Sequence, residues 1–205
     1  MTDIDEAEAA RHREKMKKRK EVQDAEVASK AIAEKGLLIV HTGKGKGKTT
    51  AAFGLALRML GYGKTVGVVQ FVKGAWHTGE RDAFAAFGDR VRWHSMGEGF
   101  TWETQDLQRD VAAAEAAWAQ AKALMADPDV ALLVLDEINI ALRYDYLSLA
   151  DVVETLRGRR AGLHVVATGR NAKPELIEAA DLVTEFEAVK HHFAAGVKAQ
   201  EGIEF

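Results

Sequence analysis

The feature that most restricts the fold is a glycine-rich loop between two apolar segments. Residues 37–40 have the composition of a β-strand, three glycines follow within residues 43–47, and residues 51–57 have the composition of a helix. Glycine allows positive φ and lets backbone N–H groups approach phosphate oxygens, and the helix N-terminus adds positive potential. The order strand, loop, helix is therefore typical of a phosphate-binding loop.

The loop resembles the pattern GxxxxGK[ST], with Thr42 in place of the first glycine. In this pattern Lys48 neutralises phosphate charge and Thr49 binds Mg²⁺. We expect Lys48 to be an exposed loop residue. A solvated turn rich in glycine and lysine is the alternative, but the flanking strand and helix disfavour it. The predicted nucleotide-binding residues of the loop are Thr42, Gly43, Lys44, Gly45, Lys46, Gly47, Lys48, Thr49 and Thr50.

Beyond residue 36 the sequence alternates between short apolar runs and helical stretches, which predicts an α/β fold with a mainly parallel six-stranded sheet. The runs contain few polar residues, so helices should cover both faces of the sheet. Ligands bind such sheets beyond the carboxyl ends of the strands. The predicted strands are 37–41, 65–71, 91–95, 130–136, 163–168 and 182–186, with helices beginning near Gly47, Gly79, Thr104, Ser148 and Pro174.

Composition divides the chain into an N-terminal charged helical arm, residues 1–35, and one catalytic domain, residues 36–205. The chain has 205 residues, of which 47% are hydrophobic, enough for one good core but thin for two. The arm lacks Gly and Pro and has few apolar residues, so it favours a solvated, partly disordered helix. A functional lid is the alternative interpretation of the arm.

The charge and the absence of cysteine exclude several classes of function. The net charge of -3 disfavours binding to nucleic acid or to an anionic membrane. Without cysteine there is no disulfide framework, thiolate nucleophile or thiolate-bound metal, which fits a cytoplasmic protein. No apolar run approaches the ~20 residues that a membrane helix needs.

Two carboxylates end the fourth predicted strand. Asp136 and Glu137 follow the apolar run 131–135, and a carboxylate at this position can hold Mg²⁺ or its water. Together with Thr49 they form the predicted metal site, although such residues could also cap a helix. The sequence leaves open which carboxylate contacts the metal.

Other polar and aromatic residues are weaker candidates. Arg170 follows the fifth predicted strand and could bind phosphate or ribose, or could be a surface residue of a turn. Phe100 and Trp102 lie in a loop on the predicted ligand side, where they could line a site for a flat ligand or belong to the core. His191 and His192 are adjacent, so we expect them to point in different directions and to form a polar loop rather than a shared metal site.

Several further segments resemble the ATP:corrinoid adenosyltransferases of cobalamin biosynthesis. The resemblance spans residues 36–205 and is most specific in the middle and C-terminal segments. The residues that carry it are Thr42–Ala52, Val68–Gly74, Gly99–Thr104, Asp136–Glu137, Thr168–Arg170 and Gly196–Glu204.

The resemblance implies a RecA-like homodimer that transfers the 5′-deoxyadenosyl group of ATP to the Co(I) of a reduced corrinoid and releases triphosphate. ATP would lie reversed in the loop relative to ordinary ATPases, with Mg²⁺ or Mn²⁺ as the metal. The implied catalytic residues are Lys48, Thr49 and Glu137, together with Phe100 and Trp102 on the lower face of the corrin ring. A reduced flavoprotein is the implied electron donor.

Two other classes of function share the phosphate loop. A RecA-like motor that binds nucleic acid would need a basic stripe, which the acidic composition disfavours. A small-molecule kinase would transfer the γ-phosphoryl group and release ADP. The preferred corrinoid, whether cobyrinic acid a,c-diamide, cobinamide or cobalamin, is left open.

Overall fold

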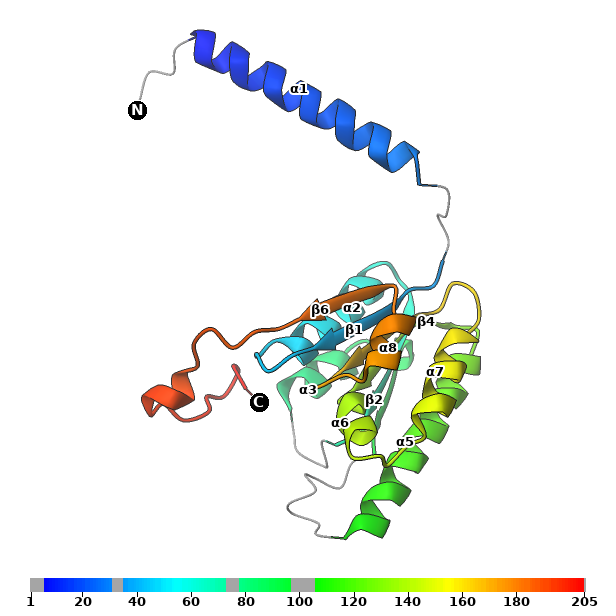
Figure 1. The fold of residues 1–205 in the computed structure, drawn as a ribbon. Helices are drawn as coiled ribbons and strands as arrows, with labels where there is room; N and C mark the ends of the chain where they lie inside the picture. The colour runs from blue at the N-terminus through cyan, green and yellow to red at the C-terminus, as the bar shows by residue number, and fades with distance from the viewer. Residues whose placement is uncertain (1–5, 31–34, 73–77, 97–105, 205) are drawn as a thin grey trace. The chain divides into compact units, whose positions relative to one another are not determined.

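The computed structural model describes residues 6–30, 35–72, 78–96 and 106–204. Its internal contacts divide the chain into two compact units, residues 1–35 and 36–205. The first unit contains α1 (Glu6–Ala28), a helix without a buried residue (Figure 1). Ion pairs one turn apart, Glu14 with Lys18 and Glu26 with Lys30, add modest support. Among the helices that the structure describes, none is both long and apolar enough to cross a membrane.

The second unit is built on a six-stranded sheet in which all neighbouring strands are parallel (Figure 1). The strand order is β3-β2-β4-β5-β1-β6, so β5 lies between β1 and β4. One strand between the phosphate-loop strand and the acidic strand is the RecA-like arrangement, and the predicted fold class is confirmed. The strands are β1 (Leu38–Thr42), β2 (Thr65–Gln70), β3 (Val91–Ser95), β4 (Val130–Asp136), β5 (His164–Thr168) and β6 (Leu182–Glu185).

Helices cover both faces of the sheet, as its uninterrupted apolar strands require. Along β4, Leu133 and Leu135 belong to one hydrophobic cluster, whereas Leu132 and Val134 belong to the other. The first cluster includes α5 (Leu107–Ala126), α6 (Ile138–Arg143), α7 (Leu149–Arg157) and α8 (Pro174–Ala179). The second includes α2 (Lys48–Gly61) and α3 (Gly79–Ala85). Two short 3₁₀ helices, η1 (Gly88–Arg90) and η2 (His192–Ala195), complete the described elements.

The predicted strands agree with the observed ones to within one residue at each end, but the helices agree less well. α5 begins at Leu107 rather than near Thr104, because Asp106 caps it by accepting a hydrogen bond from the Arg109 amide. α6 was not predicted. It is only six residues long and follows β4 directly, so its sequence continues the apolar composition of the strand.

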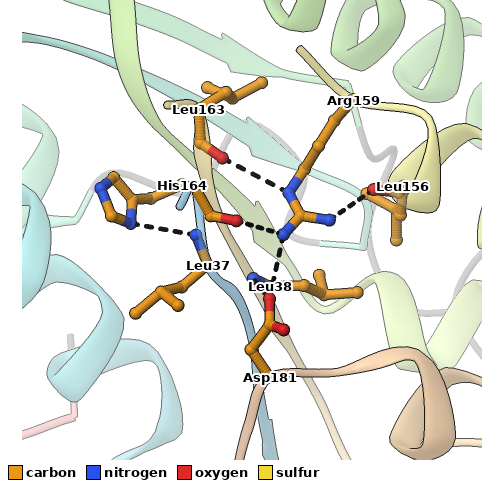
Figure 2. Close-up of polar contacts among 8 residues, drawn as sticks. Leu37, Leu38, Leu156, Arg159, Leu163, His164 and Asp181 are labelled. Carbon is orange, nitrogen blue, oxygen red and sulfur yellow. Dashed lines mark hydrogen bonds and ion pairs between the residues drawn. The ribbon is translucent and has the colours of Figure 1, made fainter. Parts of the chain in front are cut away.

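An arginine fastens the amino ends of three strands, opposite the edge where ligands are expected (Figure 2). Arg159 donates hydrogen bonds to the carbonyl of Leu156 (2.7 Å) and to the Asp181 carboxylate (3.1 Å). It also donates to the carbonyls of Gly36 and Leu163. Asp181 in turn accepts a hydrogen bond from the amide of Leu38 (2.9 Å), at the start of β1. The starts of β1, β5 and β6 are therefore held by one guanidinium.

We expect Arg159→Gln to lower the free energy of unfolding by about 2–4 kcal/mol, because it leaves a largely buried carboxylate and several carbonyls without their charged donor. The Arg159 side chain is only 9% exposed, so solvent cannot replace the lost contacts. Urea denaturation followed by circular dichroism measures the change. Arg157→Gln, at the exposed last residue of α7 two positions before Arg159, is the matched control. Equal stability of the two variants would contradict this role for Arg159.

Candidate active site

The phosphate loop between β1 and α2 closes around the side chain of Lys48. Gly43 and Gly47 have φ values of 95° and 105°, a conformation that favours glycine. The Lys48 ammonium donates hydrogen bonds to the carbonyls of Gly43 (2.9 Å) and Gly45 (2.6 Å). Lys48 is only 7% exposed, so the expectation of an exposed lysine is wrong. Its charge lies inside the loop, where phosphate oxygens would bind.

Burial and neighbouring charges act in opposite directions on this lysine. Burial lowers the pKa of Lys48, whereas the Glu137 carboxylate raises it in part. The charges of Arg170 and Lys46 lower the pKa of Lys48 further. Arg170 is exposed, and its contact with phosphate or ribose stays a prediction.

Residues 186–187, which follow β6, pack against the phosphate loop. The amide of Gly45 donates to the carbonyl of Phe186 (2.7 Å), and the amide of Phe186 donates to the carbonyl of Thr42 (2.9 Å). A Cβ atom on Gly43 would lie 2.4 Å from the Phe186 carbonyl oxygen, and one on Gly45 would lie 2.6 Å from that of Glu187. Close packing against residues 186–187 therefore requires these glycines, in addition to any phosphate contact.

Thr42, the residue that departs from the glycine of the general pattern, also has a structural contact. Its hydroxyl accepts a hydrogen bond from the amide of Ala172 (3.0 Å), and the side chain is buried. This bond ties the loop after β5, which carries Arg170, to the phosphate loop.

Asp136 is the centre of a hydrogen-bond network at the carboxyl ends of the strands. One carboxylate oxygen accepts from the hydroxyls of Thr49 (2.8 Å) and Thr168 (2.9 Å). The other accepts from the amide of Gln70 (3.1 Å). Asp136 is completely buried, so the network fixes its carboxylate and, through it, the hydroxyl of Thr49.

Glu137 lies beside this network and is only half-buried. Its φ is 64°, and its amide donates to the hydroxyl of Thr168 (3.0 Å). A Cβ atom on Gly169 would lie 3.0 Å from a Glu137 carboxylate oxygen and 2.9 Å from Cβ of Asn139. The glycine of the segment 168–170 thus makes room for this carboxylate.

The structure brings together four of the predicted site residues: Lys48, Thr49, Asp136 and Glu137. A hydroxyl and carboxylates form an oxygen donor set, which fits Mg²⁺ or Mn²⁺. Thr49 and Glu137 could contact an ion, with Asp136 orienting the threonine. Phe100 and Trp102 lie outside the described residues.

Sequence reasoning missed the residues that support these groups. Gln70 and Thr168 end β2 and β5, and the rule that identified Asp136, a polar residue at the carboxyl end of an apolar strand, could have found both. His41 is buried beneath the loop, with Nδ1 3.2 Å from the carbonyl of Lys48, and burial lowers the pKa of His41. Asn139 donates to the carbonyl of Gly169 (3.0 Å), and no sequence pattern marks it.

We expected the side chains of His191 and His192 to point in different directions, and this expectation is wrong. The rings of His191 and His192 stack, with centroids 4.8 Å apart and an interplanar angle of 28°. Glu204 joins them, and one ligating atom from each of the three lies within 4.8 Å of the others. However, Nδ1 of His191 accepts a hydrogen bond from the amide of Phe193 (3.2 Å), which places the proton of the neutral ring on Nε2. That ring nitrogen is then a donor and not a metal ligand.

A cavity of about 440 Å³ borders the phosphate loop. Its lining includes Thr42, Lys44 and Asn171, together with the carboxylates of Glu185 and Glu187. The volume is typical of small-molecule sites. Two carboxylates against one lysine are unfavourable for a polyanion, so this cavity is less suited to phosphate groups than the interior of the loop.

Comparison with known families shows to which family the chain belongs. The family model "ATP:corrinoid adenosyltransferase BtuR/CobO/CobP" matches residues 34–205. The chain belongs to the ATP:corrinoid adenosyltransferase family. A second model, "Cob(I)alamin adenosyltransferase N terminal", matches residues 1–27, so the charged arm of this adenosyltransferase is also similar to a known family segment.

Individual relatives agree with this assignment. The adenosyltransferase is 58% identical to a corrinoid adenosyltransferase of Pseudomonas aeruginosa over 195 residues, which cover 95% of this chain and 96% of the relative. It is 47% identical to the corrinoid adenosyltransferase CobA of Salmonella typhimurium, covering 95% and 98%. Among solved structures, the KaiC-like protein PH0186 of Pyrococcus horikoshii is similar at 18% identity and a TM-score of 0.44, covering 76% of this chain and 74% of that one.

Proposed function

We propose that this adenosyltransferase transfers the 5′-deoxyadenosyl group of ATP to the Co(I) of a reduced corrinoid and releases inorganic triphosphate. The observation that carries the proposal is the buried Lys48 within the phosphate loop, beside the Thr49–Asp136 pair, in a chain of the corrinoid adenosyltransferase family. The absence of cysteine from the chain fits a cytoplasmic location for this reaction.

The chemistry asks the protein to hold a leaving group. The electron pair of Co(I) forms the bond to C5′ of the ribose, the C5′–O bond breaks, and its electrons leave with the triphosphate. Because the substrate supplies the nucleophile, the protein's tasks are alignment and stabilisation of the developing charge. The loop amides, Lys48 and Arg170 would hold the triphosphate, with C5′ directed away from the loop.

Magnesium or manganese, when bound, would supply further positive charge to the triphosphate. Thr49 would hold the ion through its hydroxyl. Of the two acidic residues, we assign Glu137 to the ion, because both oxygens of the buried Asp136 already accept hydrogen bonds from protein groups. Asp136 would act through Thr49 by fixing the position of its hydroxyl.

We expect Lys48→Ala to reduce adenosyl transfer at least ~100-fold, because it removes the charge inside the loop that stabilises the leaving group. The assay is anaerobic incubation with ATP, Mg²⁺ and chemically reduced corrinoid, followed spectroscopically for the cobalt–carbon bond and chemically for triphosphate. Lys64→Ala, at an exposed lysine beyond the end of α2, is the matched control. Normal turnover by Lys48→Ala would contradict the site. Release of ADP by the wild type, with or without a phosphorylated acceptor, would support a kinase or a motor instead.

The metal assignment predicts a change in metal requirement rather than in fold. Thr49→Ala and Glu137→Gln should each raise the Mg²⁺ concentration needed for half-maximal activity by about tenfold, as expected when an oxygen ligand or its orienting partner is lost. Thr50→Ala, at the neighbouring exposed threonine, should leave this concentration unchanged. A metal titration of activity in which the three variants behave alike would place the ion elsewhere.

We further propose that Phe100 and Trp102 act on the lower face of the corrin ring by displacing the lower axial ligand of cobalt(II). An axial donor raises the energy of the orbital that accepts the next electron, so its removal makes Co(I) accessible to a reduced flavoprotein. Apolar rings fill the ligand's place without donating electrons and exclude water from the metal. The support is the resemblance of residues 99–104 to the family.

Phe100→Ala and Trp102→Ala should therefore impair turnover from cob(II)alamin far more than turnover from corrinoid already reduced to Co(I). The measurement compares initial rates from the two oxidation states, with the melting temperature of each variant as the control for folding. Equal loss with both substrates would identify the two rings as packing groups.

We also propose that the protein forms a homodimer and that its N-terminal arm acts as a lid over the corrinoid. Exposed apolar surface of this kind favours association of two chains. From β6 onward the exposed large apolar side chains are Leu182, Val183, Val189, Phe193, Val197 and Ile203. We propose that the arm, residues 1 to about 30, covers a corrinoid site of its own or of the other subunit and becomes ordered there when substrate is present, since only ligand contacts would offset the entropic cost of ordering it.

A further inference from the structure

Residues 191–204 return to the phosphate loop and place a carboxylate on one of its lysines. An oxygen of Glu204 lies 3.0 Å from Nζ of Lys46, and the other lies 2.9 Å from Nε2 of His192. Lys46 is the loop residue between Gly45 and Gly47. The Glu204 side chain is 16% exposed and that of Lys46 is 56% exposed. A distant part of the sequence thus neutralises a charge of the phosphate loop.

We propose that Glu204 is an internal counter-ion of the phosphate loop, which competes with the triphosphate of ATP and of the product for Lys46. The proposal rests on the proposed function in so far as triphosphate is the leaving group. Glu204 thereby lowers the affinity of the loop for polyanions.

The positions of the charges support this competition. The loop holds three lysines within five residues: Lys44, Lys46 and Lys48. Lys46 is two residues before Lys48, and its charge lowers the pKa of Lys48, so the two ammonium groups act on one another. Whatever pairs with Lys46 therefore also alters the potential that a phosphate group experiences beside Lys48.

Glu204 is held in place for this pairing. The imidazoles of His191 and His192 stack beside it, and the amide of Glu204 donates to the carbonyl of Gln200 (3.0 Å). The hydrogen bond from Lys46 lowers the pKa of Glu204 and so favours the charged carboxylate. Lys46, His192 and His191 are the titratable groups that act on it, in that order.

The consequence for catalysis concerns product release. A loop whose cations were all available would bind ATP and the leaving triphosphate tightly, and equally tight binding of both adds nothing to the rate. Release of a polyanionic product can limit turnover. When the Glu204 carboxylate pairs with Lys46 again, the affinity of the loop for the product falls, while Lys48 and the loop amides stay in place.

The test is a double-mutant cycle on the dissociation constant of inorganic triphosphate, measured calorimetrically with Mg²⁺ on the full chain. Glu204→Gln should lower this constant by about two- to fivefold, the range expected for a partly exposed ion pair. Glu204→Asp, which shortens the reach, should lower it less. In the Lys46→Met background, Glu204→Gln should change the constant little, since the pair is already broken.

Glu201→Gln, at an exposed glutamate of the same segment, is the matched control and should have no effect. An unchanged or raised dissociation constant in both Glu204 variants would overturn the proposal. Equal tightening in the Lys46→Met background would overturn it as well, because the effect would then come from net charge alone. Triphosphate binding with the expected differences but without formation of a cobalt–carbon bond would reject the proposed function and leave the counter-ion in place.

Discussion

The site depends on one buried carboxylate, that of Asp136. Placing an ionised carboxylate in the interior is costly unless it is paired or hydrogen-bonded. Here three donors, from Thr49, Thr168 and Gln70, compensate it at distances of 2.8 to 3.1 Å. These donors come from α2 and from the two strands that flank β4. The hydrogen bonds that compensate the burial of this carboxylate therefore also fix the position of the phosphate loop relative to the strand ends.

The phosphate loop is shaped by packing as much as by its ligand. Gly43 and Gly45 lie so close to the backbone of residues 186–187 that any side chain would collide with it. The loop is thus held between α2 and the chain beyond β6, and Thr42 adds a bond to the loop after β5. The backbone of residues 186–187 therefore shapes the phosphate loop from outside it.

The sequence predicted what depends on local composition. The strands are short apolar runs, so their bounds were predicted nearly correctly. The phosphate loop and the end of β4 carry their motifs in consecutive residues, so these motifs were found as well. The burial of Lys48 was missed because it follows from the fold of the loop around its own carbonyls. The stacked histidines and the return of Glu204 to Lys46 were missed because they depend on contacts between residues far apart in the sequence or on one irregular turn. No period or propensity encodes such contacts.

Two carboxylates act on the loop cations from different parts of the chain. Burial lowers the pKa of Lys48, and the Glu137 carboxylate opposes this shift in part. Glu204 pairs with the exposed Lys46. The first carboxylate acts on the buried cation inside the loop, whereas the second acts on an exposed cation of the same loop. In the proposed reaction the nucleophile arrives with the substrate, so the side chains need to supply little other chemistry and the balance of these charges becomes the main property that the protein can adjust.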